Sequence, residues 1–589
     1  MKPVYVIWAY GVRGLWDHAL MEAALAGELW PDVVRPSAHV VPEDRARCAP
    51  PAPAEGAILI GSWGGFAESD RLKGTRHADE IATATAELPW CLFAQTSDEQ
   101  VALPPPVARA RLRHWLFSSR PGRPADRRIL LGWPPGTREV VARHPRRPLV
   151  AREHRWFFSG QVNHKARLDT VAALTGRTDG LLQPTGGFIQ TVEGRPAFIE
   201  HLTRTAIAPC PGGWMTPETF RLYEALEAGC VPICSSDAPL WKPGEQGDYW
   251  THVLGEPPPF PVLSDWTRIG RVIDELLADP VGLQRLANRC SAWWLGYKRQ
   301  VALALEDDLA ALTGEPSARP PVTVLIPTSS VLSNPSTEYI EHTIRKIRGY
   351  PDLREAEVII MIDGLPEVHA ARGADYEEYK RRLIDLCAWH PDFRGCLPLV
   401  FEEHTHQANM ARRALELVRT PAILYCEHDL HPVGAIDWAG MLRALEKPGV
   451  NAIRLHGHET VLPDHSHLFG PVEQVAGVPM MRTKAWWHRP HVARTNWYRH
   501  IISALFGRQA RTMIEDVLYA VMATRIEGKI DTVEEWGVWV YAPDTPRGGD
   551  GPQGFLRSIH TNAREYEPKL PMVFAYDGEP PTGAPKATP

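Results

Sequence analysis

The sequence predicts an α/β protein composed of three units, each with a largely parallel sheet. Apolar runs of strand length alternate with helical patterns along the chain, an order that produces parallel sheets covered by helices. The 589 residues exceed what one hydrophobic core holds and correspond to roughly three or four units of about 150 residues. The apolar fraction of 44% and the charged fraction of 23% are those of an ordinary soluble globular protein.

The first two units are predicted at residues 1–150 and 151–312. In the first, strand patterns at Val4–Trp8 and Ala57–Ile60 are each followed by glycines, and a helical pattern lies between them at Asp17–Ala26. Neither glycine cluster matches the dinucleotide-binding fingerprint, so no NAD site is predicted.

The second unit begins near Trp156 and ends with a long helical pattern at Val281–Leu312. Two Rossmann-like units in tandem predict a ligand in the cleft between them, because open α/β sheets bind ligands at the carboxyl ends of their strands. A linker rich in Pro and Gly follows at residues 313–321. The tail at 577–589, rich in Pro, Gly and Ala, is predicted to be disordered.

The third unit is predicted at residues 322–576. Its strand patterns are Val322–Pro327, Glu357–Asp363 and Ala422–Cys426, and a further helical pattern at Asn409–Val418 leads into the last of these. The alternation again predicts a mostly parallel sheet.

Composition excludes several classes of protein. A net charge of -6 provides no global basic field for nucleic acid, and nine scattered cysteines without a C-x-x-C pair argue against disulfides and against a cysteine zinc site. No stretch approaches about 18 uncharged apolar residues, and the chain begins directly with a strand pattern. We therefore expect no membrane span and a cytoplasmic location.

The acidic triplet Glu427-His428-Asp429 follows the strand pattern that ends at Cys426. Carboxylates two residues apart on an extended segment point to the same side. Hard cations such as Mg²⁺ or Mn²⁺ are held by one or two carboxylates together with substrate phosphates. The triplet therefore predicts a divalent metal site, although an isolated E-x-D is also an ordinary charged junction.

Four segments of the third unit resemble the GT-A nucleotide-sugar glycosyltransferases, nearest the family 2 type. They are Val322–Thr328, Ile359–Gly364, Leu424–Asp429 and Met513–Val517. The resemblance implies that Asp363 contacts the base or ribose of a nucleotide-sugar donor and that Asp429 and Glu427 hold Mn²⁺ or Mg²⁺ on its diphosphate. E-H-D departs from the usual D-x-D, so Asp429 is the firmer ligand.

The same resemblance assigns three further roles. Glu515-Asp516 matches an E-D pair in which one carboxylate takes the proton of the acceptor hydroxyl, with Asp516 the first choice and Glu515 the fallback. The pair would otherwise be an acidic helix start. His560 is implied as a ligand of the metal or diphosphate. Asn409 is either a donor contact or a helix N-cap.

Two other features of this unit have two interpretations each. The pairs His456/His458 and His465/His467 have spacings that could bind zinc, but no thiols or paired motif support this. The aromatic and basic stretch 486–499 is either a wall for the acceptor or a partly buried, Trp-rich helix pair.

Three segments of the second unit resemble the exostosin-like GT-B glycosyltransferases: Phe158–Gln161 followed by Arg167, Ala208–Gly212, and Arg221–Ile233. The resemblance implies a nucleotide-sugar site that includes the Gly160 motif, with Glu224 as the ribose ligand and Arg221 or Arg167 on the diphosphate. A guanidinium can neutralise phosphate bidentately without a metal. The alternative is a salt-bridged helix surface.

One departure concerns the E-x7-E pattern of many other GT-B enzymes. It is absent, because Thr216 occupies the position of the first glutamate, and Glu218 is a nearby substitute. The first unit resembles the family only in layout, so no catalytic base is named there.

Together these features predict a tandem Rossmann-like GT-B pair followed by a GT-A domain, which is a bifunctional glycosyltransferase acting on a glycan or lipid-linked saccharide. Two alternatives stay open: sugar transfer to hydroxymethylated bases in DNA, and a chain in which one module is inactive and serves as a glycan-binding or scaffolding domain. The sequence does not specify the donor sugar, the stereochemistry or the oligomeric state.

Overall fold

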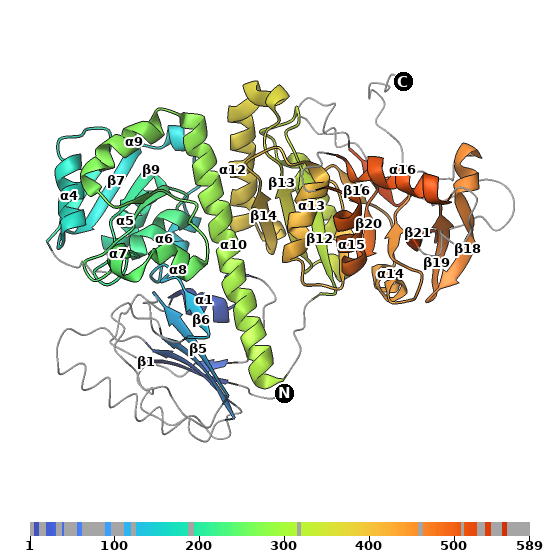
Figure 1. The fold of residues 1–589 in the computed structure, drawn as a ribbon, viewed down its shortest axis with the longest axis horizontal. Coiled ribbons are helices and arrows are strands. Elements are labelled where there is room, and N and C mark those ends of the chain that lie inside the picture. Colours follow the sequence, from blue (N-terminus) through green and yellow to red (C-terminus); the bar gives the residue numbers. More distant parts are fainter. Residues whose placement is uncertain are drawn as a thin grey trace. The chain divides into compact units, whose positions relative to one another are not determined.

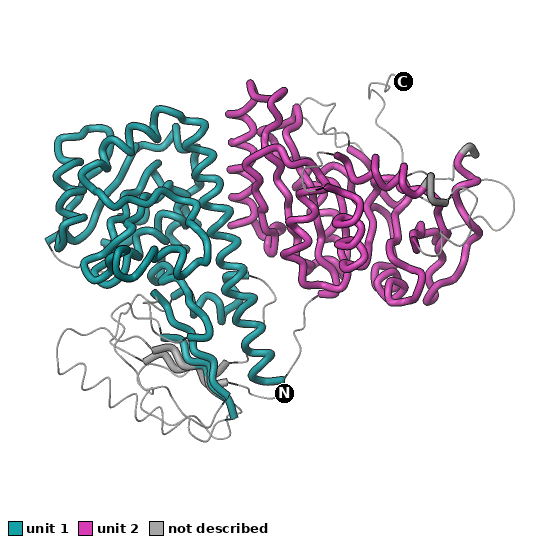
Figure 2. Tube along the Cα trace, in the orientation of Figure 1, with its two compact units in different colours: residues 1–318 teal, residues 319–589 magenta. Residues whose placement is uncertain are grey.

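The chain divides into two compact units, residues 1–318 and 319–589 (Figure 2). The computed structural model describes residues 5–10, 19–30, 38–40, 56–61, 89–95, 111–118, 125–186, 194–314, 320–457, 463–507, 512–526, 536–543 and 556–561. The predicted tail at 577–589 and the glycines at 11, 14 and 64–65 lie outside these residues. Each unit is treated by itself below.

The first sheet of unit 1 has six parallel strands in the order β2-β1-β3-β4-β5-β6. Their bounds are β1 Tyr5–Tyr10, β2 Ala38–Val40, β3 Ala57–Gly61, β4 Trp90–Gln95, β5 Arg111–Phe117 and β6 Arg127–Ile129, and helix α1 (Ala19–Leu25) lies between β1 and β2 in the chain. Every residue of β4 is buried, as expected of a strand covered on both faces.

The second sheet of unit 1 has five parallel strands in the order β11-β10-β9-β7-β8 (Figure 1). Their bounds are β7 His154–Gln161, β8 Leu181–Thr185, β9 Thr205–Cys210, β10 Val231–Ser235 and β11 Val262–Leu263. Strand β8 follows β7 and lies on one side of it, whereas β9, β10 and β11 are added in chain order on the other side. The β7/β9 boundary is therefore a topological switch point, where such sheets bind ligands.

Helices connect the strands of this second sheet. They are α3 Thr137–Ala142, α4 Lys165–Leu174, α5 Gly194–Thr203, α6 Phe220–Glu227, α7 Pro243–Gln246, α8 Tyr249–Leu254 and α9 Ile269–Leu277. The apolar residues that the helices and strands bury form one core around Trp156, Phe158, Ile207 and Ile233.

The long helix α10 (Pro280–Thr313) packs against elements of both sheets of unit 1. Asp279 caps it by accepting a hydrogen bond from the Gly282 N–H at 2.9 Å, and Pro280 occupies its first turn, where no N–H is needed. Asp308 of α10 accepts hydrogen bonds from the Trp115 indole at 2.8 Å and from Arg127. These buried bonds fix the helix on the first sheet.

Unit 2 contains a mixed sheet of nine strands in the order β14-β13-β12-β15-β20-β17-β21-β19-β18. The bounds are β12 Val322–Thr328, β13 Glu357–Ile362, β14 Cys396–Val400, β15 Ala422–Tyr425, β17 Ala452–Arg454, β18 Phe469–Val475, β19 Val478–Thr483, β20 His491–Arg494 and β21 Val538–Tyr541. The first four in this order are parallel, and β15 pairs with β20 in the antiparallel sense. The β12/β15 boundary is a second switch point.

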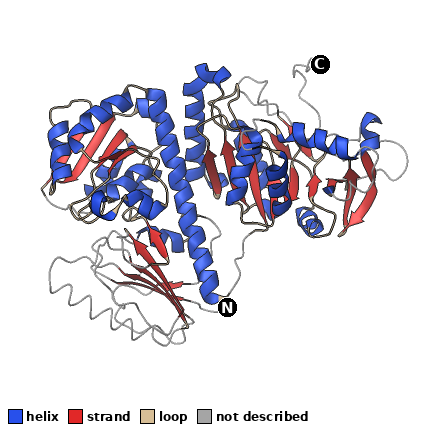
Figure 3. Ribbon diagram, in the orientation of Figure 1, coloured by secondary structure: helices blue, strands red, loops and turns tan. Residues whose placement is uncertain are grey.

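Helices α11 to α13 connect the parallel strands of unit 2. Figure 3 distinguishes helices, in blue, from strands, in red. The bounds are α11 Glu338–Arg348, α12 Gly373–Trp389, α13 His406–Leu417, α14 Trp438–Leu445, α15 Thr495–Leu505 and α16 Ile514–Ile526. A separate antiparallel pair joins β16 (Leu430–Pro432) to β22 (Ser558–His560).

The structure confirms the predicted strands and helices, with shifts at their ends. The mostly parallel sheet predicted for residues 322–576 was wrong, because half of the strand pairings in the nine-stranded sheet are antiparallel. The helix predicted at Asn409–Val418 begins at His406, and Thr405 is its N-cap, so the N-cap interpretation of Asn409 was wrong. The predicted helix pair in 486–499 is also wrong, because β20 occupies His491–Arg494 and α15 begins only at Thr495. Among the described residues no helix combines the length and apolar character needed to cross a bilayer.

Candidate functional site

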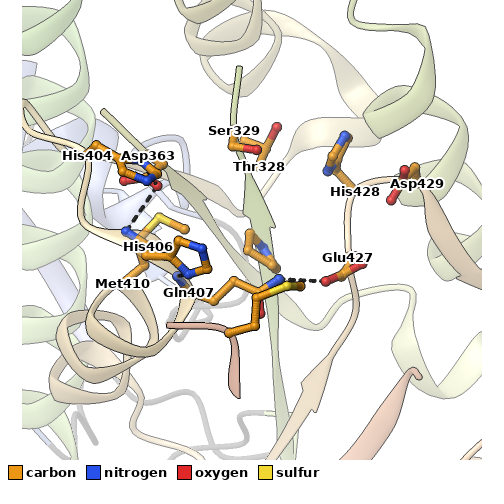
Figure 4. A pocket seen from close by; sticks show the side chains of 12 residues that line it. Thr328, Ser329, Asp363, His404, His406, Gln407, Met410, Glu427, His428 and Asp429 are labelled. Carbon is orange, nitrogen blue, oxygen red and sulfur yellow. Dashed lines mark hydrogen bonds and ion pairs between the residues drawn. The ribbon is translucent and has the colours of Figure 1, made fainter. Parts of the chain in front are cut away.

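A pocket in unit 2 lies at the carboxyl ends of β12, β13 and β15, at the switch point (Figure 4). Its volume, including the solvent at its mouth, is about 460 Å³. The side chains that line it come from these strand ends and from the start of α13: Pro327, Thr328, Ser329, Asp363, His404, His406, Gln407, Met410, Glu427, His428, Asp429 and Met513. Most of these side chains are polar.

The three predicted metal ligands form one group, of which Glu427 and Asp429 line the pocket and His560 lies beside Asp429. Glu427, Asp429 and His560 each offer one ligand atom, and these atoms all lie within 4.8 Å of one another. The His560 Nε2 atom is 3.6 Å from Asp429 Oδ2. Two carboxylate oxygens and one imidazole nitrogen form a donor set that suits Mn²⁺ or Mg²⁺. The residues present therefore fit a divalent cation.

Strand pairing brings His560 to the acidic triplet from about 130 residues away in the chain. Strand β16 begins at Leu430, directly after Asp429, and its first residue pairs with His560 on β22. Beyond β22, the N–H of Thr561 donates a hydrogen bond to the Asp429 carbonyl at 2.7 Å, and its hydroxyl donates another at 2.9 Å. The histidine is thus anchored next to the carboxylates by backbone contacts.

Burial and a neighbouring negative charge act together on Glu427. Burial raises the pKa of this carboxyl group above its usual value, and Asp429 raises it further, whereas a hydrogen bond from Gln407 opposes the shift. The side-chain amide of Gln407 donates this bond to Glu427 Oε1 at 2.6 Å. A cation between the two carboxylates would remove their repulsion.

Asp363 follows β13 and is only 1% exposed. Its carboxylate accepts hydrogen bonds from the backbone N–H groups of Gly364, Thr405 and His406, and His404 Nδ1 lies 2.9 Å from Oδ2. His406 has a φ of 65°, a left-handed conformation that costs a non-glycine residue about 1 kcal/mol or more. In the structure Asp363 thus holds the loop before α13, and its contact with a donor stays a prediction.

The two acidic residues at the start of α16 differ in burial. Glu515 is partly buried, and its carboxylate accepts a hydrogen bond from the His488 backbone N–H. Burial raises the pKa of Glu515, and Glu427 raises it further. Asp516 is exposed. The geometry therefore favours Glu515, the second choice from the sequence, as the group that faces the triplet.

The remaining predicted residues of unit 2 are placed as follows. The Asn409 side chain accepts a hydrogen bond from Arg412 Nη1 at 2.8 Å and is not part of the pocket lining. Within the described residues the only group of His, Cys, Asp and Glu side chains close enough to hold a metal is the one around Asp429, and His458 of the zinc hypothesis lies outside them. Trp486 is fully buried, whereas Trp487 stacks on Phe469.

In unit 1, three arginines lie near the β7/β9 switch point, and two of them act on the buried carboxylate of Glu224. Arg167, Arg195 and Arg221 lie in the first turns of α4, α5 and α6, the helices that follow β7, β8 and β9. Arg195 Nη2 lies 3.1 Å from Oε1 of Glu224, which is 5% exposed. Burial raises the pKa of Glu224, and Arg195 and Arg221 oppose this. Glu139 also acts on Arg195, so three guanidinium groups meet two carboxylates, which leaves an excess of positive charge.

Arg167 spans the switch point itself. Its guanidinium donates hydrogen bonds to the carbonyls of Gln161 at 3.1 Å and of Gly212 at 3.1 Å and 3.3 Å, which follow β7 and β9. Burial and the neighbouring Arg221 lower its pKa to about 9. No carboxylate among the described residues forms an ion pair with it. An anion would relieve the repulsion between the two arginines.

Two nitrogen atoms of the Arg221 guanidinium can still donate hydrogen bonds. Its Cζ lies 5.0 Å from the ring centre of Phe158, and its buried Nε and Nη1 have no hydrogen-bond partner among the described residues. A Cβ atom on Gly160 would lie 2.0 Å from Arg221 Nη2, and φ at Gly160 is +150°. Gly160 therefore permits the guanidinium to lie flat on the end of β7.

Glu218 cannot replace the missing glutamate as a ligand in this conformation. Oε2 accepts hydrogen bonds from the Leu131 N–H at 2.6 Å and from the Tyr223 hydroxyl, and Oε1 accepts one from the Tyr249 hydroxyl. At 2% exposure this carboxylate joins the segment after β6 to the second sheet and has a structural role.

Three residues of these sites were missed from the sequence. Arg195 belongs to no recognised motif, and Gln407 and His404 reach the pocket only because α13 and the loop before it are held by Asp363. For Gln407 a signal existed, since a polar run, His406-Gln-Ala-Asn409, stands at the start of the helix that leads to the triplet.

Comparisons with protein-family models and with curated protein sequences give no match. Solved structures show partial similarity. A mannosyltransferase from Pyrobaculum calidifontis in complex with GDP-Man and Mn²⁺ is 18% identical, covering 40% of this chain and 60% of that chain, with a TM-score of 0.24. S. aureus TarS 1–349 in complex with UDP-GlcNAc is 13% identical, covering 39% and 59%, with a TM-score of 0.25. The bifunctional IspDF from Campylobacter jejuni is 10% identical, covering 37% and 48%, with a TM-score of 0.21.

This chain thus spans less than two thirds of the length of these chains. TM-scores near 0.25 are too low to transfer a fold or an activity. The functional argument therefore rests on the geometry of the two sites.

Proposed function

We propose that the chain is a glycosyltransferase with two nucleotide-sugar sites, one metal-dependent in unit 2 and one metal-independent in unit 1. The observation that carries the proposal is the group formed by Glu427, Asp429 and His560, two of which line a pocket at a switch point. In this proposal unit 2 is a GT-A domain and unit 1 a GT-B pair, as the sequence motifs predict. The acceptor is a hydroxyl group of a glycan or lipid-linked saccharide.

In unit 2, Asp429, Glu427 and His560 would hold Mn²⁺ or Mg²⁺. A cation bound there stabilises the negative charge that develops on a departing nucleoside diphosphate. The loop that Asp363 anchors, with His404 and His406, forms the opposite wall of the pocket and would contact the donor. Donor binding would thus use both the strand ends and the start of α13.

The acceptor hydroxyl needs a base, because an alcohol is a poor nucleophile until its proton is accepted. Glu515 would take this proton. Its raised pKa, caused by burial and by Glu427, makes it a stronger base than an ordinary glutamate. Asp516 is the alternative base from the sequence motif.

In unit 1, Arg221 and Arg167 would bind a diphosphate directly. The support is the excess of guanidinium groups over carboxylates and the unpartnered Nε and Nη1 of Arg221. Glu224 would accept hydrogen bonds from ribose hydroxyls, provided that its pairing with Arg195 leaves its second oxygen available. No catalytic base is assigned in this unit.

The test is the release of nucleoside diphosphate from a panel of nucleotide sugars by the full chain, with Mn²⁺ and with EDTA. We expect a manganese-dependent and a manganese-independent activity toward separate donors. If no nucleotide sugar is turned over or bound under either condition, the proposed function is wrong. If only one activity is found, the other unit is a binding module.

A further inference from the structure

We propose that Gln407 is a positioning residue for the divalent metal: its side-chain amide holds Glu427 in the orientation that leaves one carboxylate oxygen for the cation. This inference rests on the metal site proposed above. No sequence motif assigned a role to Gln407.

The contact is short and buried. Gln407 Nε2 donates to Glu427 Oε1 at 2.6 Å, and Gln407 is 8% exposed (Figure 4). His488 Nε2 lies 3.8 Å from the same oxygen, beyond hydrogen-bond distance. Oε1 is therefore fixed by Gln407, and Oε2 is the oxygen left for a metal.

Gln407 is itself held by a chain of contacts. Its backbone N–H donates to His406 Nδ1 at 3.0 Å, and the backbone N–H of His406 donates to Asp363 at 3.1 Å. The left-handed backbone of His406 sets the direction in which α13 starts. A chain of hydrogen bonds thus connects the end of β13 with the metal ligands after β15. It runs from Asp363 through His406 and Gln407 to Glu427.

The second atom of the amide also faces this site. Gln407 Oε1 is buried and has no hydrogen-bond partner among the described residues, although Gln407 lines the pocket. A buried, unpaired amide oxygen next to a metal site can accept a hydrogen bond from water bound to the cation. The amide would then donate to a ligand of the metal with one atom and accept from its hydration shell with the other.

The experiment measures Mn²⁺ binding to the full chain by titration calorimetry, with free Mn²⁺ followed by electron paramagnetic resonance. Outer-shell partners of metal ligands typically affect affinity by about 10- to 100-fold. We expect this loss of affinity in Gln407→Met, which keeps the size of the side chain but removes both polar atoms.

The control is Gln474→Met on β18, an exposed glutamine outside the pocket, which should bind Mn²⁺ as wild type does. Unfolding midpoints in EDTA separate a metal effect from a folding defect: a Gln407→Met chain that unfolds as wild type does in EDTA and binds Mn²⁺ weakly supports the inference. If it binds Mn²⁺ with unchanged affinity, the inference is wrong and the metal site stands. If wild type has no binding that depends on Asp429, both are wrong.

Discussion

The two candidate sites occupy equivalent places in their sheets but carry opposite charge. In unit 1, Arg195 and Arg221 act on Glu224 near the β7/β9 switch point, with Arg167 beside Arg221. In unit 2, Glu427 and Asp429 meet at the β12/β15 switch point. Both sites use the carboxyl ends of parallel strands, where helix N-termini also favour anions.

The difference in charge corresponds to two ways of binding a phosphate group at the end of a parallel sheet. A guanidinium neutralises a phosphate directly and keeps its charge at neutral pH. Carboxylates repel a phosphate unless a cation lies between them, so the second site depends on metal and on pH. The predictions below separate the two sites by these properties.

The largest effect is expected for Asp429→Ala. Removing the most buried ligand should lower manganese-dependent release of nucleoside diphosphate at least about 1,000-fold, since metal stabilisation of a leaving group contributes several kcal/mol. The activity in EDTA, assigned to unit 1, should not change. Equal loss of both activities would mean that the two sites do not act separately.

Glu515→Gln and Asp516→Asn test the catalytic base as a matched pair. A general base contributes about 100- to 10,000-fold. We expect a loss in this range for Glu515→Gln and less than about threefold for Asp516→Asn, measured as transfer to an acceptor at saturating donor. Donor affinity should not change. A larger loss for Asp516→Asn than for Glu515→Gln would identify Asp516, which the sequence motif favours, as the base.

Arg221→Gln tests the metal-independent site. Charge-assisted hydrogen bonds contribute about 1.5–3 kcal/mol each, so the affinity for nucleoside diphosphate in EDTA should fall about 10- to 100-fold. Gly160→Ala should weaken binding in the same way without removing a charge, because its Cβ would displace the Arg221 guanidinium. Arg271→Gln, at an exposed pair with Glu275, is the control and should bind normally.

The smallest effect is expected for the stability of the metal-free chain. The folded-state pKa of Glu427 is raised above its unfolded value, so the ionised group destabilises the fold at neutral pH, and this penalty is relieved as pH falls through the raised pKa. Glu427→Gln should therefore stabilise unit 2 in EDTA by roughly 1 kcal/mol at pH 7 and by less near pH 4. Thermal unfolding at both pH values measures this.

The same shift predicts how metal binding depends on pH. Mn²⁺ requires the ionised carboxylate, so its affinity for wild type should begin to fall at a pH above the range in which an ordinary glutamate titrates. An affinity that stays constant down to pH 5 would indicate that Glu427 is not a ligand.

Local sequence patterns were sufficient to predict the strands and helices on which the site residues lie. The apolar runs at β12, β13 and β15 and the carboxylates after them follow from strand periodicity and from chain order in a parallel sheet. The sequence also predicted that Glu427 and Asp429 act together, but for the wrong reason: they do not lie on an extended segment. His428 and Asp429 lie in a turn that the Leu430 N–H closes on the Glu427 carbonyl at 3.1 Å.

The order of preference within Glu515-Asp516 was not predictable from the sequence. Neighbours in a helix differ by 100° in direction, and only packing decides which of them faces the pocket. Glu515 lies next to the His488 backbone, whereas Asp516 faces solvent. The same limit applies to Asn409, whose position inside α13 turns it toward Arg412.

The sequence by itself predicted the α/β alternation, a linker at residues 313–321 and the residue types that can bind a metal or an anion, because these depend on local periodicity and chemistry. Only the tertiary structure decided which distant residues join them. His560 reaches Asp429 through the pairing of β22 with β16, and Arg195 reaches Glu224 through the packing of α5 beside α6. Such contacts depend on the register and packing of segments far apart in the chain, which no local pattern specifies.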